Sequence, residues 1–194
     1  MKRVALLGAT GSIGAQAIDI VERNPELELC ALMSGAQPLT ELAAAHGVAH
    51  VEVGGSASAL LGAAEPDIVL NAIVGFAGVE ATLWALERGI TLALANKESL
   101  VAAGELALAA HRRGGGLLLP VDSEHSAIFQ CLEGRDRDTV ESIVIFGPMR
   151  QVGWASASAR VTAASSSCDR PRNGPPEAVS TSEWTVSGSR PSRH

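Results

Sequence analysis

The chain has 194 residues, of which 19% are charged and 46% hydrophobic, and its formal net charge is −6. These values are typical of a globular protein and argue against a disordered polyelectrolyte and against a nucleic-acid-binding surface, which needs clustered Lys and Arg. No apolar run approaches the ~20 residues of a membrane span, and the apolar stretch after Met1 is too short for a secretory signal. Cys30, Cys131 and Cys168 form no CxxC pair, so we expect no disulfide scaffold, no thiolate zinc site and a reducing compartment.

The composition changes sharply near residue 145. Leu occurs 21 times in residues 1–145 and not once in residues 146–194, which also lack Ile and Lys. A segment without Leu or Ile buries too little apolar surface to offset the entropy that ordering costs. We therefore predict a folded domain over residues 1–145. We interpret residues 146–194 as a disordered tail or as the product of a shifted reading frame.

Apolar runs and segments of helical period alternate along residues 1–145. The apolar runs predict strands over residues 3–7, 27–33, 48–53, 67–73, 90–95, 117–121 and 140–145. Between them we predict a helix that begins at Ser12 and stops at Pro25, helices over 39–46 and 56–64, a helix that ends at Gly89, and a helix over 98–113. Strands separated by helices predict an α/β fold with a Rossmann-like, doubly wound parallel sheet.

A glycine-rich turn joins the first strand to the first helix, with the sequence GATGSIG at residues 8–14. Its glycines permit a tight turn, close approach of backbone N–H groups to a pyrophosphate, and close helix–strand packing. Any sharp turn favours glycine, but this one opens a series of strand–helix units, so we predict a dinucleotide site. No carboxylate follows the second strand at Ser34, which favours NADP over NAD, although no Arg stands there either.

A first polar cluster, Asn96, Lys97 and Glu98, follows the fifth predicted strand. In one interpretation Asn96 caps the next helix, while Lys97 and Glu98 are solvated first-turn residues. In the other, Asn96 binds the nicotinamide ribose and Lys97 binds an anionic or carbonyl group of the substrate. The cluster lies where a doubly wound sheet places its ligands, at the carboxyl end of a strand.

A second polar cluster follows the sixth predicted strand and contains Asp122 and Glu124. Two carboxylates around a turn can converge on one hard cation through oxygen ligands, as Mg²⁺ or Mn²⁺ prefers. Alternatively, Asp122 caps a helix and Glu124 lies in its first turn. We expect the adjacent His125 to be a surface or packing residue rather than a metal ligand.

The motifs GATGSIG, ANKESLV and LLPVDSEHSAIFQ, in this order and spacing, resemble those of the 1-deoxy-D-xylulose 5-phosphate reductoisomerases over residues 1–145. The resemblance implies a cytoplasmic enzyme of non-mevalonate isoprenoid biosynthesis. Such an enzyme rearranges a sugar phosphate, 1-deoxy-D-xylulose 5-phosphate, and reduces the product with NADPH to 2-C-methyl-D-erythritol 4-phosphate. It also implies Mg²⁺ or Mn²⁺ as the metal, no nucleic-acid or membrane partner, and a homodimer in intact family members.

The same resemblance assigns roles to individual residues. It implies that Thr10, Gly11, Ser12 and Ile13 bind the NADPH pyrophosphate. It also implies that Gly35, Ala36 and Gln37 bind the adenosine ribose phosphate, and that Asn96 and Glu98 contact other parts of the cofactor. The metal is held by Asp122 and Glu124. The substrate is bound by Lys97, Ser123 and Glu124, of which Lys97 and Glu124 are the catalytic candidates.

The chain departs from the family pattern in two places. Family members often carry Lys where this chain has Ala36, which predicts a weaker affinity for NADPH. After Ile145 the family has a Ser-Gly-Gly-Pro-Phe-Arg loop, a Trp-containing lid and a Ser-Ala-x-x-x-Asn-Lys-x-x-Glu segment that supplies phosphate contacts and a third metal carboxylate. This chain has only the sequence GPMR at residues 147–150. We therefore expect cofactor binding from this chain without full activity.

Two other functions stay open at this point. A homoserine-type dehydrogenase has the same Rossmann half and a Lys, and metal-independent turnover would identify it. A non-catalytic dinucleotide-binding module would bind NADPH without metal-dependent turnover. A short-chain dehydrogenase is excluded, because the chain contains no Tyr to serve as its catalytic acid. A Cys-dependent aldehyde dehydrogenase is not favoured, because Cys131 lies in an apolar helical stretch, where we expect it to pack.

Overall fold

The computed structural model describes residues 1–134 and two short strands, β7 (Ile143–Ile145) and β8 (Ala159–Val161). The chain divides into two compact units, Met1–Cys131 and Leu132–His194. In the second unit β7 and β8 pair in antiparallel orientation, so the strand predicted over 140–145 is not part of a parallel sheet. The rest of the predicted tail lies outside the described residues.

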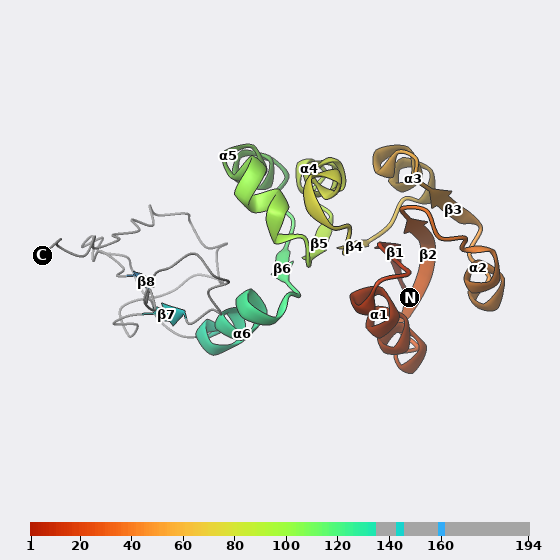
Figure 1. The fold of residues 1–194 in the computed structure, drawn as a ribbon, viewed down its shortest axis with the longest axis horizontal. Coiled ribbons are helices and arrows are strands. Elements are labelled where there is room, and N and C mark those ends of the chain that lie inside the picture. Colours follow the sequence, from red (N-terminus) through yellow and green to blue (C-terminus); the bar gives the residue numbers. More distant parts are fainter. Residues whose placement is uncertain (135–142, 146–158, 162–194) are drawn as a thin grey trace, which may run out of the picture. The chain divides into compact units, whose positions relative to one another are not determined.

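Six strands alternate with helices in the first unit (Figure 1). The strands are β1 (Lys2–Leu7), β2 (Leu27–Ser34), β3 (His50–Val53), β4 (Ile68–Asn71), β5 (Thr91–Leu94) and β6 (Leu118–Pro120). The helices are α1 (Ser12–Arg23), α2 (Thr40–His46), α3 (Ala57–Ala64), α4 (Val79–Glu87), α5 (Lys97–Gly114) and α6 (Ser123–Leu132), with a short 3₁₀ helix η1 (Gly75–Gly78) before α4. The bounds predicted for strands and helices in this part differ from these by no more than two residues.

The six strands form one parallel sheet in the order β3-β2-β1-β4-β5-β6. Strands β1 to β3 thus follow one another toward one edge of the sheet, and β4 to β6 follow one another toward the opposite edge. This is the Rossmann strand order. This confirms the fold class predicted from the sequence. In such sheets ligands bind outside the carboxyl ends of the strands, at the point where the direction reverses. Here that point lies between β1 and β4.

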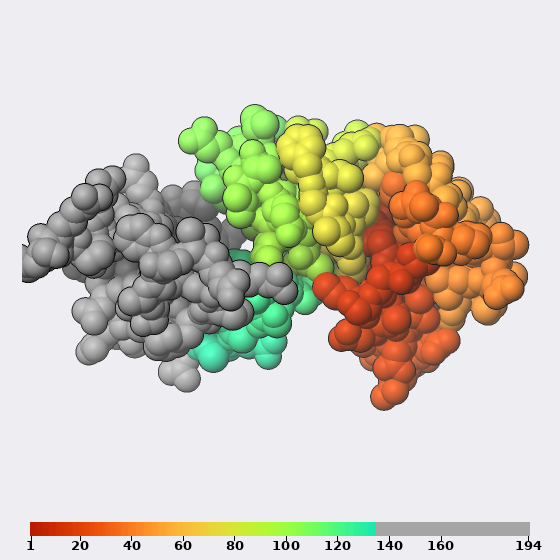
Figure 2. Space-filling model, viewed as in Figure 1, coloured from red at the N-terminus to blue at the C-terminus, as the bar shows by residue number. Residues whose placement is uncertain are grey.

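The core is formed by the apolar runs that were predicted as buried strands together with apolar residues of the helices that cover them. Leu6 and Leu7 of β1 are fully buried but face opposite sides of the sheet. Leu7 packs in a cluster with residues of α3, α4 and α5, and Leu6 packs in a second cluster with residues of α1 and α2. Figure 2 shows α4 (yellow) and α5 (green) side by side. Helices therefore pack on both faces of the sheet around β1 and β2, as a parallel sheet requires.

Helix α6 differs from the other helices because none of its residues is buried. Cys131, at its carboxyl end, was expected to pack but is exposed, since no described residue covers that side of α6. Cys30 is buried in β2, and both thiols are free. Among the helices that the structure describes, none is long and apolar enough to cross a membrane.

Candidate functional site

The predicted site residues all follow strands at the carboxyl edge of the sheet. Backbone hydrogen bonds join the strands at this edge. The N–H groups of Gly8 and Ala9 each donate to the carbonyl oxygen of Met33 at 2.9 Å, and the N–H of Ala95 donates to that of Asn71 at 3.0 Å. The loops that carry the site therefore start from fixed positions on a rigid sheet.

The glycine loop, residues 8–14, requires glycine at both of its ends. Gly8 has a φ of +85°, and a Cβ at this position would lie 2.5 Å from the carbonyl oxygen of Ala72. A Cβ on Gly14 would lie 2.5 Å from the carbonyl oxygens of Gly8 and Ala9. These close approaches bring the first turn of α1 against the end of β1 and bring the end of β4 against Gly8.

The amino end of α1 is suited to an anion. Its N-cap residue is Gly11, which has no side chain to cap the helix, and the first turn contains no acidic residue. Thr10, Gly11 and Ser12 are exposed and Ile13 is half-buried. Backbone N–H groups at a helix amino end carry partial positive charge and bind phosphate groups. The four residues predicted to hold a pyrophosphate thus lie together at one such end.

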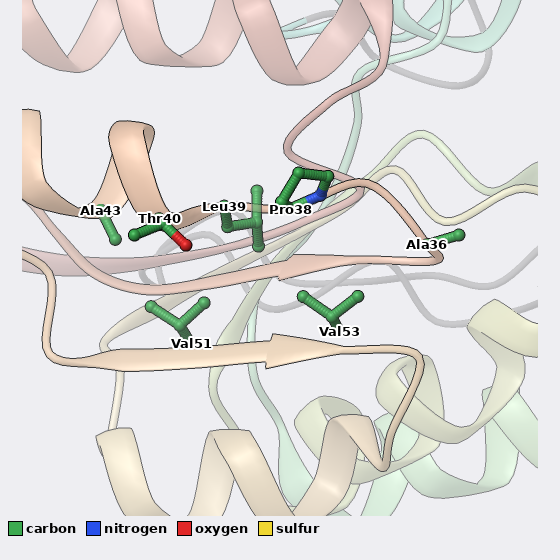
Figure 3. Close-up of a pocket in the computed structure, with 7 residues that line it drawn as sticks. All are labelled: Ala36, Pro38, Leu39, Thr40, Ala43, Val51 and Val53. Carbon is green, nitrogen blue, oxygen red and sulfur yellow. The ribbon is translucent and has the colours of Figure 1, made fainter.

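The loop after β2 lies beside a pocket. The buried Ser34 donates its hydroxyl proton to the carbonyl oxygen of Gln37, which closes a turn and leaves Gly35 and Ala36 exposed. The pocket, of about 470 Å³, lies between α2 and β3 (Figure 3). It is lined by Ala36, Pro38, Leu39, Thr40, Ala43, Val51 and Val53. The side chains in this lining are apolar apart from one hydroxyl, so they offer a dinucleotide neither an acid nor a cation.

Asn96 caps α5 and at the same time holds the loop that follows β4. Its Oδ1 accepts hydrogen bonds from the backbone N–H of Ser99 at 2.7 Å and the Ser99 hydroxyl at 2.6 Å. Its Nδ2 donates to the carbonyl oxygens of Ile73 and Gly75. The capping role considered for Asn96 is therefore observed. Because the buried amide has all its hydrogen-bonding positions in use, we expect Asn96 to act on a cofactor through the elements that it positions.

A second buried asparagine, Asn71, was missed by the sequence analysis. Its Nδ2 donates to the carbonyl oxygen of Gly78 at 2.8 Å and to Thr82 Oγ1 at 3.0 Å, and its Oδ1 accepts from the N–H of Ile73 at 3.2 Å. Gly78 is required here, because a Cβ would overlap the Asn96 amide. The available signal was a polar residue inside an apolar strand. Asn71 and Asn96 together hold both ends of the β4–α4 loop.

The two polar motifs meet at the ends of β5 and β6. Lys97 Nζ lies 3.6 Å from Glu124 Oε2, and the Ser123 hydroxyl donates to the same oxygen at 2.8 Å. The Ser123 hydrogen bond lowers the pKa of Glu124 most, and the Glu124 backbone N–H and then the positive charge of Lys97 lower it further. The structure thus brings together three of the predicted substrate and metal residues. Glu98 lies next to Lys97 and is exposed.

Asp122 caps α6 and pairs with His125. Its Oδ1 accepts from the N–H groups of Glu124 at 3.1 Å and His125 at 2.8 Å, and His125 Nδ1 lies 2.8 and 3.0 Å from the two carboxylate oxygens. Burial opposes ionisation of Asp122, but the hydrogen bonds from His125 outweigh it and lower the pKa of this carboxyl. His125 is exposed, as expected for a surface residue, and its hydrogen bond to Asp122 was not predicted.

The donor chemistry of Asp122 and Glu124 fits a hard divalent cation, because both are ionised carboxylates at neutral pH. Within the residues that the structure describes, no set of three His, Cys, Asp or Glu side chains is arranged to hold a metal ion. A metal ion bound by these two carboxylates would therefore need further ligands.

Family models match almost the whole of this fold. The model for 1-deoxy-D-xylulose 5-phosphate reductoisomerase matches residues 4–59 and 36–104, and the model for the C-terminal domain of the same enzyme matches residues 118–170. The second match extends past Ile145 into the leucine-free segment.

Curated relatives are similar over the same region. The reductoisomerase of Ruegeria pomeroyi is 44% identical over 170 residues, which cover 75% of this chain and 43% of the relative. That of Mycobacterium tuberculosis is 43% identical over 178 residues, which cover 80% of this chain and 42% of the relative. The chain thus spans less than half the length of the curated relatives that it matches.

Solved structures of reductoisomerases have the same fold. The enzyme from Zymomonas mobilis in complex with NADPH is 40% identical, with a TM-score of 0.59 over 72% of this chain and 44% of that one. A reductoisomerase in complex with NADPH, fosmidomycin and magnesium is 32% identical, with a TM-score of 0.59 over 69% of this chain and 40% of that one. A biliverdin reductase from Synechocystis, 24% identical with a TM-score of 0.51, shares the fold alone. On the family-model matches and the identity to these relatives, the chain belongs to the 1-deoxy-D-xylulose 5-phosphate reductoisomerase family.

Proposed function

We propose that this chain is the dinucleotide-binding part, with the beginning of the catalytic part, of an NADPH-dependent 1-deoxy-D-xylulose 5-phosphate reductoisomerase. The observation that carries this proposal is the contact between Lys97 and Glu124. It joins two polar motifs from different strands into one cluster at the edge where this fold binds ligands. The solved complexes of related enzymes with NADPH and with magnesium support these two ligands for this chain.

The cofactor would cross the sheet at the point between β1 and β4. The amino end of α1, with Thr10, Gly11, Ser12 and Ile13, would bind the pyrophosphate through backbone N–H groups. The adenosine half would extend toward Gly35, Ala36 and Gln37 after β2. The nicotinamide half would extend toward Glu98 after β5, over the loop that Asn96 holds.

The metal and the sugar phosphate would bind at the ends of β5 and β6. When bound, the divalent ion polarises an oxygen of the substrate. Asp122 and Glu124 would hold the ion, and the bonds from His125 and Ser123 keep the two carboxylates anionic. Lys97 places a positive charge beside Glu124, where it would bind an anionic group of the substrate together with Ser123. The proposal extends, on the family resemblance, to a homodimer of the intact enzyme in the cytoplasm.

Two alternatives to this function were considered, and different observations bear on each. A homoserine-type dehydrogenase is not favoured, since the relatives at 32–44% identity described above are reductoisomerases. A non-catalytic dinucleotide-binding module remains the second candidate. It is supported by one observation, namely two metal carboxylates without a third ligand in the part of the chain that the structure describes.

The proposal is tested by titrating the chain with NADPH, followed by nucleotide fluorescence, and with Mn²⁺, followed by the paramagnetic resonance of the free ion. We expect saturable binding of NADPH, and we expect Asp122→Asn to weaken Mn²⁺ binding about tenfold or more because it removes a charged ligand. Asp19→Asn, on the exposed face of α1, is the matched control and should bind Mn²⁺ like the unaltered chain.

The outcomes of these titrations distinguish the cofactor proposal, the metal assignment and the non-catalytic module from one another. Absence of NADPH binding would overturn the cofactor proposal, and equal Mn²⁺ binding by Asp122→Asn and its control would overturn the metal assignment. NADPH binding by an unaltered chain that does not bind Mn²⁺ would identify the non-catalytic module.

A further inference from the structure

Strand β3 is the last strand at one edge of the described sheet, and its sequence does little to protect that edge. An edge strand presents unpaired N–H and C=O groups, which proteins commonly guard with Pro or Lys. Residues 48–55 have the sequence VAHVEVGG, which contains neither. The strand at the opposite edge, β6, ends with Pro120. Of the two edges of this sheet, that of β3 is therefore the better suited to accept a further strand.

The backbone of β3 directs alternate residues toward β2 and away from it. The N–H of Gly54, which follows the strand, donates to the carbonyl oxygen of Ser34 on β2 at 2.9 Å. Because peptide groups alternate in direction along a strand, the N–H and C=O of Glu52 also face β2, and those of Val51 and Val53 face outward. The outward N–H of Val53 donates to Oε1 of Glu52 at 3.1 Å. A carbonyl oxygen of an added strand could replace the carboxylate at this donor.

Val51 and Val53 also expose apolar side chains. Val51 is 37% exposed and Val53 is 43% exposed. Both line the pocket of about 470 Å³ beside α2, and Figure 3 shows their side chains directed toward the start of this helix. Ala49, two residues before Val51, is small and exposed. A strand added at this edge would therefore cover apolar surface on this face of the sheet, which favours its binding.

The other face of β3 carries two residues of complementary chemistry. Successive side chains of a strand point to opposite faces, so His50 and Glu52 lie on the side of α3, where both are half-buried. When two identical strands pair in antiparallel orientation with Val51 opposite Val51, His50 of each copy lies opposite Glu52 of the other. An imidazole N–H donates to a carboxylate, and complementary cross-strand pairs stabilise a sheet. This complementarity of β3 with itself favours a second copy of the chain as the added strand.

The same register satisfies the outward backbone groups. It pairs Val51 with Val51, and it pairs Val53 of each copy with Ala49 of the other, so that outward N–H and C=O groups meet. The carbonyl oxygen of Ala49 then accepts from the Val53 N–H, and Glu52 is released to His50 of the other copy. Because a contact of one surface with itself has two-fold symmetry, it closes at two copies and forms a dimer.

We propose that two copies of this chain associate through β3, in antiparallel orientation and centred on Val51, so that their two sheets join into one. The inference requires neither a cofactor nor a metal, so it is independent of the proposed function. The interface lies within residues 1–134 and uses none of the residues proposed to bind the cofactor, the metal or the substrate.

Sedimentation equilibrium of the complete chain over a series of concentrations measures this association. The unaltered chain should form a reversible dimer. Val51→Lys places like charges opposite each other at the two-fold axis and should raise the dissociation constant about tenfold or more. Leu106→Lys, at an exposed position on α5, adds the same charge away from β3 and should leave the constant within about twofold.

A charge exchange tests the register. Glu52→Lys removes the group opposite His50 and should weaken the dimer. Adding His50→Glu to this variant places a carboxylate opposite the new ammonium group and should restore the association.

A cross-link provides a second measurement, in a chain that carries Cys131→Ser and Cys168→Ser. Directly opposed residues of an antiparallel pair have Cα atoms about 5.5 Å apart, a separation that a disulfide spans. Oxidation should therefore link two copies of Val51→Cys. Val101→Cys, at a position on α5 that is 86% exposed, is the matched control and should remain unlinked.

A chain that stays monomeric at every concentration would overturn the proposal, and so would a dimer that Val51→Lys leaves intact. Failure of His50→Glu to restore the association of Glu52→Lys would overturn the register, and equal cross-linking of Val51→Cys and Val101→Cys would overturn the contact at the two-fold axis. Circular dichroism verifies that each variant is folded. If Val51→Lys does not fold, the charge exchange and the cross-link decide the question.

Discussion

Asn71 and Asn96 bury amide groups at the carboxyl ends of β4 and β5, where an unpaired polar group is costly. Each amide uses both its oxygen and its nitrogen in hydrogen bonds. Fully satisfied buried networks specify a single arrangement of the groups that they join. At the residue scale, these two side chains therefore determine the shape of the loop beside the predicted cofactor site.

Asn71→Ala is predicted to lower the free energy of unfolding by about 2–4 kcal/mol, because it leaves buried partners such as the Gly78 carbonyl and the Thr82 hydroxyl without a hydrogen bond. Urea denaturation at neutral pH measures the change. Asn24→Ala, at an exposed position after α1, should lower the free energy of unfolding by less than about 1 kcal/mol. An Asn71→Ala variant as stable as this control would contradict the hydrogen-bond network.

At the scale of elements, the helix amino ends fall into two kinds. The amino end of α1 has no capping side chain among the described residues, so no side chain accepts from its first-turn N–H groups there. The amino end of α3 is closed from both sides, by Ser56 in its own loop and by Glu80 from the first turn of α4. Glu80 Oε1 accepts from the hydroxyls of Ser56 at 2.8 Å and Ser58 at 2.5 Å, and from the Ser58 N–H at 3.2 Å. Packing between helices thus satisfies α3 and leaves α1 open.

The hydrogen bonds to Glu80, with that from the Ser58 hydroxyl the largest, lower its pKa below the ordinary value. A group with a lowered pKa in the folded state stabilises the fold above its unfolded pKa of about 4.3, and this stabilisation is lost as the pH falls through the folded-state pKa. Glu80→Gln should therefore be less stable than the unaltered chain at pH 7. Because the carboxylate is exposed, the loss should stay below about 1 kcal/mol.

The measurement for Glu80→Gln is the urea midpoint at a series of pH values from 7 to 3. We expect the gap between variant and unaltered chain to shrink as the pH falls, since Glu80 becomes protonated. Glu105→Gln on α5 removes the same charge from an exposed position without a helix end nearby. A gap for Glu80→Gln that stays constant over this range would refute the assigned role of the carboxylate.

At the scale of the whole sheet, which lies within residues 1–134, positive charge is segregated along the strand direction. Helices run opposite to the strands, so cations in last helical turns, such as Arg23, Arg112 and Arg113, lie at the amino edge of the sheet. Among residues 1–134, Lys97 is the only Lys or Arg at the carboxyl edge. Phosphate groups that bind at this edge would therefore depend on helix amino ends, on Lys97 and on a divalent ion for neutralisation.

A domain boundary at residue 145 remains a prediction, and truncation tests it. The six-stranded sheet, both core clusters and the proposed cofactor residues all lie within residues 1–134. A chain that ends at residue 145 should therefore unfold at the same temperature as the complete chain and bind NADPH equally well. Calorimetry and nucleotide titration measure both properties. A chain that ends at residue 95 lacks α5 and β6 and should lose cooperative unfolding. A lower unfolding temperature for the 145-residue chain would place the boundary further along.

The sequence by itself determined the fold class and the order of elements, because apolar runs and helical spacing are local patterns. The motifs at residues 8–14 and at Lys97 and Glu124 were also readable, since parallel strands bring their carboxyl ends to one edge. The 3₁₀ helix η1 was not predicted, because residues 75–78 have no helical period. The start of α6 was predicted in one of two interpretations, in which Asp122 caps a helix and Glu124 lies in its first turn, and the structure shows this cap.

Only the tertiary structure decided how the residues of the site are paired. It showed that Lys97 forms an ion pair with Glu124, that His125 is hydrogen-bonded to Asp122, and that Asn96 is hydrogen-bonded to the β4–α4 loop. It also revealed the hydrogen bond of Asn71 to Gly78. Two of these contacts, that of Lys97 with Glu124 and that of Asn96 with the β4–α4 loop, join residues from different loops, whose distance depends on strand order and on the course of each loop. The hydrophobic periodicity of the sequence specifies neither the strand order nor the course of the loops. The sequence could therefore locate the edge of the sheet that carries the site, and the fold was needed to decide which side chains remain available there to a ligand.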